Sequence, residues 1–170
     1  AGLKVAVYHY ATFSNSGSGW NEGNHMADCL RKLGLGPNTL IFADMEDRAT
    51  LNNQVKNGLN SFWGALNNAG YRNHAVYVYA GYKYRDAVIS TVGKSRTWLA
   101  QYPFTPSRGG YYERQWRSQG YGAWQFASTS RMPWNWWFGN LDLSTDFNGL
   151  LTNAPSTSVS NGWLGNKYYV

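Results

Sequence analysis

The stretch Leu40-Ile41-Phe42-Ala43-Asp44-Met45-Glu46 decides how this chain is expected to fold. A run of four apolar residues predicts a strand, and the acidic residues close it. Side chains alternate between the two faces of a strand, so residues two positions apart point the same way. Asp44 and Glu46 should therefore stand side by side, with their Cα atoms roughly 6.5 Å apart.

Two carboxylates held this close repel each other, and one of them tends to stay protonated near neutral pH. Cleavage of a glycosidic bond needs such a pair, one acid to protonate the leaving oxygen and one carboxylate to stabilise positive charge. The alternative is a solvated acidic turn, because Asp47 and Arg48 follow directly.

The residues around this stretch predict alternating strands and helices. Further strands are expected over 4–11, 75–80, 97–102, 123–127 and 141–143, helices over 26–33, 51–66 and 82–89, and a Ser/Gly/Asn loop over 14–19. Strands separated by helices indicate parallel βα units, in an open sheet or a barrel. Ligand sites in such α/β folds lie beyond the carboxyl ends of the strands, which is where the acidic pair falls.

The composition fits one domain and limits its partners. The 170 residues include 17% aromatic and 14% charged side chains, and the net charge is +6. Aromatic rings either fill the core or stack on the flat faces of sugars. The positive charge favours anionic partners. No dense Lys/Arg run is present, which argues against nucleic acid, and no apolar stretch is long enough for membrane insertion.

We expect no cofactor, no metal ion and no intrachain disulfide. Cys29 is the single cysteine of the chain. His25 lies four residues before it, on the same helical face, but no second pair of ligands accompanies them. The aromatic run at 134–138 has two readings, a loop that grips a polymer or an apolar plug over the barrel end.

Five motifs resemble the lysozymes of glycoside hydrolase family 25, in the family's order and at about its spacing. They are Tyr8-His9-Tyr10, Asp44-Met45-Glu46, Trp98-Leu99-Ala100-Gln101-Tyr102, Trp124-Gln125-Phe126 and Asn140-Leu141-Asp142-Leu143-Ser144. The resemblance implies a TIM-like (β/α) barrel and an N-acetylmuramidase that cleaves bacterial peptidoglycan. It covers residues 1–151, after which we expect a linker over 152–160 and the start of a wall-binding module over 161–170.

Carried over residue by residue, the resemblance makes Glu46 the general acid and base. Asp44 would position the substrate N-acetyl group or stabilise the charge that this group acquires. Asp142 would orient the pair, with Asp146 as the alternative. Four side chains are candidates for sugar contacts, each with packing inside the barrel as the alternative role: Tyr8, Tyr79, Trp98 and Gln125.

The chain departs from the family at its N-terminus. Nothing before Lys4 supplies the family's first two strands, one of which carries an active-site Asp. We therefore expect an incomplete barrel with open sheet edges, through which two copies could associate as a homo-oligomer. The alternative to an active muramidase is a catalytically impaired relative that binds peptidoglycan. The resemblance implies a protein that acts at the cell wall, either secreted or released by a phage at lysis. Residues 1–5 show no features of a signal peptide.

Overall fold

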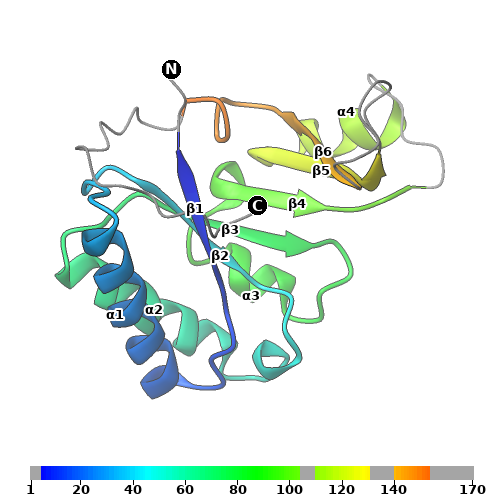
Figure 1. Cartoon of the computed structure of the whole chain (residues 1–170). Coiled ribbons are helices and arrows are strands. Elements are labelled where there is room, and N and C mark those ends of the chain that lie inside the picture. Colours follow the sequence, from blue (N-terminus) through cyan, green and yellow to red (C-terminus); the bar gives the residue numbers. More distant parts are fainter. Residues whose placement is uncertain (1–4, 104–109, 131–139, 154–170) are drawn as a thin grey trace.

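The computed structural model describes residues 5–103, 110–130 and 140–153 (Figure 1). The strands are β1 (Ala6–Tyr10), β2 (Leu40–Asp44), β3 (His74–Tyr79), β4 (Thr97–Ala100), β5 (Ala123–Ser130) and β6 (Leu141–Asp146). The helices are α1 (Ser16–Lys32), α2 (Val55–Asn68), α3 (Arg85–Ile89) and α4 (Tyr111–Ser118), with short 3₁₀ turns at Arg48–Thr50 and Lys94–Arg96. The expected alternation of strands and helices is confirmed.

The six strands form one curled sheet in chain order, β1 to β6, and the strand direction turns strongly from β1 to β4 (Figure 1). Neighbours from β1 to β5 are parallel, whereas β6 runs antiparallel to β5. A parallel return needs a crossover of a dozen or more residues, and residues 131–140 provide only ten between β5 and β6. The architecture is an α/β half-barrel, as the resemblance predicted.

The two faces of the sheet have different surroundings. The outer face carries Ile41 and Ala43 of β2, which pack in the main core with Leu30 of α1 and Leu59 of α2. The inner face carries Leu40, Phe42 and Asp44 of the same strand, and the first two belong to a smaller apolar cluster. β2 is buried along its whole length, so its side chains meet protein on both faces.

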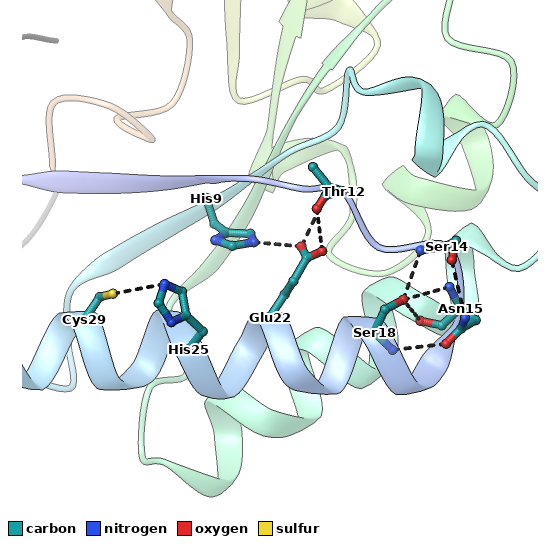
Figure 2. A network of polar contacts seen from close by, with 8 residues as sticks. All are labelled: His9, Thr12, Ser14, Asn15, Ser18, Glu22, His25 and Cys29. Atoms are coloured by element: carbon teal, nitrogen blue, oxygen red, sulfur yellow. Dashed lines mark hydrogen bonds and ion pairs between the residues drawn. The ribbon is translucent and has the colours of Figure 1, made fainter.

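Helix α1 begins earlier than the sequence predicted. The loop expected over 14–19 is wrong from Ser16 onward, because a capping box starts the helix there. The Asn15 side chain accepts a hydrogen bond from the Ser18 backbone N–H at 3.0 Å, and the Ser18 hydroxyl accepts one from the Asn15 N–H at 3.1 Å (Figure 2). These bonds satisfy backbone donors that a helix start otherwise leaves unpaired.

Two glycines of α1, one of them in the predicted loop, allow α1 and α2 to approach closely, side by side along one face of the sheet (Figure 1). A Cβ on Gly19 would lie 2.1 Å from the Gly58 carbonyl oxygen, and one on Gly23 would lie 2.6 Å from the Phe62 carbonyl oxygen. Both contacts are with backbone, which cannot rotate away. These positions are therefore set by packing between the helices and not by turn formation.

A polar network joins the end of β1 to α1 (Figure 2). Glu22 lies 2.8 Å from His9 Nε2, and it accepts hydrogen bonds from the Thr12 hydroxyl at 2.7 Å and the Thr12 N–H at 3.2 Å. The ring of His9 also stacks on Phe62 of α2. The network holds the chain that leaves β1 against both helices.

Several expectations concern residues that the structure does not describe. The aromatic run at 134–138, most of the linker and the expected module over 161–170 lie outside the described residues. Within the described residues, no helix is both long and apolar enough to cross a bilayer. Helix α4 is an element that the sequence analysis missed; its Trp116 donates a hydrogen bond to Gln101 Oε1 at 2.9 Å, just past β4.

The helix contact predicts opposite effects for two Gly→Ala changes. Gly19→Ala should lower the free energy of unfolding by about 1–3 kcal/mol, because its methyl group would overlap backbone of α2. Gly64→Ala should raise it by up to about 1 kcal/mol, because a Cβ there finds only ordinary contacts and alanine favours a helix. Urea denaturation of both variants tests this; stabilisation by Gly19→Ala would contradict the proposed close contact.

Candidate active site

The acidic pair lies at the carboxyl end of β2, as predicted. The strand ends at Asp44, and Met45 turns into the core at 0% exposure. Backbone hydrogen bonds continue on both sides, from Ala11 N–H to the Asp44 carbonyl and from Met45 N–H to the Tyr77 carbonyl, each at 3.0 Å. Asp44 is thus fixed between two neighbouring strands, whereas Glu46 lies just beyond the strand with an exposed side chain.

Asp44 has an unusual environment for a carboxyl group. Its side chain is 9% exposed, and Oδ1 is buried without a hydrogen-bond partner among the described residues. Burial, and then the negative charge of Glu46, raise the pKa of Asp44 from 3.8 to about 7. The sequence predicted that repulsion within the pair would keep one carboxyl protonated near neutral pH; the pKa of Asp44 is raised in that direction, with burial as the larger cause and the charge of Glu46 as the smaller.

Tyr8 and Trp98 are candidate sugar contacts that stand on the inner face with Asp44. Tyr8 pairs with Phe42 in the β1–β2 register and is 60% exposed. Trp98 of β4 packs edge-to-face on Phe42, with ring centroids 5.6 Å apart, and its Nε1 donates to the Ser144 hydroxyl at 3.1 Å. Tyr79 sits at the end of β3, where its ring packs edge-to-face on Tyr82. The exposed ring of Tyr8 is the most accessible of the three.

The fourth candidate, Gln125, is the centre of a hydrogen-bond cluster that the sequence analysis did not predict. Its side-chain oxygen accepts from the Tyr77 hydroxyl at 2.7 Å and from the Tyr102 hydroxyl at 3.1 Å. Tyr77 pairs with Asp44 in the β2–β3 register. The alternation that selects Tyr79 selects Tyr77 equally, since the two are two residues apart on β3. That signal was present, but the contact to Gln125 spans 48 residues.

The structure separates the two acidic candidates near the last strand. Asp146 accepts hydrogen bonds from the backbone N–H groups of residues 148, 149, 151 and 152 and from the Thr152 hydroxyl. Burial alone would raise its pKa, but the bonds from Thr152, Leu151 and Gly149 lower it. Asp146 therefore organises the turn that follows β6. Asp142 is exposed, on the part of β6 that pairs with the second half of β5.

Metal-binding groups are sparse in the described part of the chain. His25 Nε2 lies 3.6 Å from Cys29 Sγ on α1, the pair that the sequence singled out (Figure 2). No group of three or more His, Cys, Asp or Glu residues that could hold an ion occurs among the described residues.

An open α/β half-barrel with paired carboxyl groups at the carboxyl end of a strand is an arrangement typical of the barrel-type glycosidases. The family model for glycosyl hydrolases family 25 matches residues 1–134. The chain belongs to this family. No curated protein matches the sequence.

Three solved structures share the fold. The catalytic domain of endolysin ply40, from bacteriophage P40 of Listeria monocytogenes, is 21% identical with a TM-score of 0.62, over 90% of this chain and 72% of that domain. The autolysin LytC of Streptococcus pneumoniae, solved with a synthetic peptidoglycan ligand, is 19% identical with a TM-score of 0.59, over 81% of this chain. The match spans 32% of LytC. The Tat-secreted protein Rv2525c of Mycobacterium tuberculosis is 16% identical, over 85% of this chain and 68% of that one, with a TM-score of 0.54.

The raised pKa of Asp44 predicts a pH-dependent loss of stability. Between pH 3.8 and about 7 the folded state holds a proton that the unfolded state has released, so stability falls as pH rises through this window. Asp44→Asn removes this loss and should be more stable than wild type at pH 8, by on the order of a few kcal/mol. Thermal melts from pH 4 to 8 measure it. A constant difference between the two proteins across that range would contradict the assignment.

Asp142 and Asp146 should respond in opposite ways to the same change. Asp146→Asn should lower the melting temperature, because the amide nitrogen cannot accept the hydrogen bonds that the carboxylate accepts. Asp142→Asn should leave the melting temperature within about one degree, since surface changes away from packed features are close to neutral. Differential scanning calorimetry measures the melting temperatures of the two variants. A large decrease for Asp142→Asn would show that Asp142 also has a structural role.

Proposed function

We propose that this chain is a peptidoglycan hydrolase of the lysozyme type, an N-acetylmuramidase. Its substrate would be the β-1,4 bond between N-acetylmuramic acid and N-acetylglucosamine. Family membership and the fold support the reaction class. The observation that carries the proposal is the Asp44–Glu46 pair: the first has a buried oxygen without a partner among the described residues, and the second has an exposed carboxyl.

Glu46 is the residue that we assign to proton transfer. It would protonate the glycosidic oxygen as the bond to the sugar C1 breaks, so the leaving sugar departs with its hydroxyl restored. The carbonyl oxygen of the substrate's own N-acetyl group would form the new bond to C1, which the family resemblance implies. Glu46, now ionised, would then take a proton from the water that opens this intermediate. Exposure of the Glu46 carboxyl suits exchange with substrate and water.

Asp44 is the residue that we assign to the N-acetyl group. Its buried Oδ1 is an acceptor without a donor among the described residues, and an acetamide N–H is a donor. Burial makes ionisation of the Asp44 carboxyl group costly. A positive charge that develops on the acetamido group would therefore stabilise the Asp44 carboxylate. The substrate would thus supply the hydrogen-bond donor that Asp44 Oδ1 lacks, and the Asp44 carboxylate would supply the negative charge that stabilises the acetamido group.

The surroundings of the pair support a glycan as the ligand. Tyr8 and Trp98 present aromatic rings on the same inner face as Asp44, and sugars stack on such rings. The net charge of +6 favours approach to the anionic polymers of a bacterial wall. We place the activity at the cell wall, which the protein would reach by secretion or by release from a phage-infected cell at lysis.

The test is release of reducing ends from purified Gram-positive peptidoglycan. Glu46→Gln should reduce release by at least about a hundredfold, the usual contribution of a general acid, while binding to wall sediment is kept. Asp28→Asn, which removes an exposed acid of α1, serves as the matched control and should act like wild type. Wild-type rates in the Glu46 variant would refute the assignment of the acid. Wall binding without release by the wild-type chain would instead indicate a protein that binds peptidoglycan only.

A further inference from the structure

The amide of Gln125 is held in one orientation by two tyrosines. The side chain is 2% exposed. Its oxygen accepts hydrogen bonds from the hydroxyl groups of Tyr77 at 2.7 Å and Tyr102 at 3.1 Å. A carbonyl oxygen accepts two hydrogen bonds, so this end of the amide is fully used. Within the described residues, the amide nitrogen makes no hydrogen bond, and it retains two N–H donors.

Both tyrosines donate a hydrogen bond to Gln125, but their surroundings differ. Tyr77 is half-buried on β3, whereas Tyr102 follows β4 and is 50% exposed. Burial, the hydrogen bond and charge of Tyr102, and then the charges of Glu46 and Asp44 raise the pKa of Tyr77. Its hydroxyl therefore stays protonated at every pH where the acids work, and it remains a donor to Gln125.

The cluster lies beside the acidic pair. Tyr77 pairs directly with Asp44 in the sheet register, and Gln125 faces the same side of the sheet through Tyr77. Ser144, the register partner of Gln125, reaches Trp98 on this face as well. The amide nitrogen of Gln125 is thus a fixed donor on the inner face, close to where the proposed function places the glycan.

We propose that Gln125 Nε2 donates a hydrogen bond to the acetamido carbonyl oxygen of an N-acetylhexosamine next to the cleaved bond. Tyr77 and Tyr102 act as positioning residues that keep the nitrogen turned toward the ligand. A carbonyl oxygen is a fitting partner because it accepts only, so a donor held in place distinguishes it from a free amine. The identity of the ligand rests on the proposed function, whereas the orientation of the amide does not.

Calorimetric binding tests this without turnover. Soluble peptidoglycan glycan fragments are titrated into Glu46→Gln protein that carries Tyr77→Phe with Tyr102→Phe, Gln125→Met, or all three changes. The paired tyrosine changes and Gln125→Met should each raise Kd about three- to tenfold, the effect of one hydrogen bond. The triple change should be no worse than Gln125→Met alone, because the tyrosines act only through the amide.

Two controls separate recognition from packing. Tyr71→Phe removes another buried hydroxyl, which donates to the Leu35 carbonyl at 3.0 Å, and it should leave Kd unchanged. De-N-acetylated fragments should bind all variants with the same weak affinity. If the paired tyrosine variant does not fold, Tyr102→Phe alone, on a half-exposed ring, should still raise Kd about twofold.

The outcomes are distinguishable from those of the proposed function. Additive losses in the triple variant, or unchanged Kd in the tyrosine variants, would overturn the positioning role even if the wild-type chain hydrolyses peptidoglycan. Failure of the Glu46→Gln protein to bind any fragment would overturn it as well. Absence of hydrolysis together with the predicted pattern of Kd values would reject the muramidase and keep the donor site.

Discussion

Burial of β2 on both faces is the constraint on which the rest of this structure depends. Ile41 and Ala43 pack toward the helices, Leu40 and Phe42 pack toward the inner face, and β1 and β3 pair along both edges. A strand enclosed in this way cannot shift its register without moving apolar side chains from one face to the other. Its last residue, Asp44, is therefore fixed in a place where water is scarce, and the properties of the site follow from that position.

The inner face shows how a packed sheet can carry chemistry. In the part of the chain that the structure describes, Asp44 has an oxygen without a partner and a raised pKa, and the hydroxyl of Tyr77, its register neighbour, donates to Gln125. An unsatisfied buried polar group is costly, so the unpaired oxygen of Asp44 at the carboxyl end of β2 is typical of a functional site. The well-satisfied Asp146 is the contrast: its many hydrogen bonds make it part of the scaffold.

Sequence periodicity predicted most of the fold. The apolar runs predicted six strands and three of the helices between them, because burial of one face leaves a regular spacing of apolar residues. It missed the start of α1, where glycines meant close packing with Gly58 rather than a loop. It also missed α4, and it did not indicate that β6 is antiparallel, since strand direction depends on how the chain crosses the sheet and not on local pattern.

By itself the sequence determined the acidic pair at the end of a buried strand and the family to which the chain belongs, because both are written in short local motifs. Only the tertiary structure decided that Asp44 has a pKa near neutrality, since desolvation depends on all the surrounding elements. Likewise, Tyr77, Tyr102 and Gln125 come from three separate segments. Their hydrogen bonds exist because the sheet brings those segments together, and no local spacing in the chain encodes such a meeting.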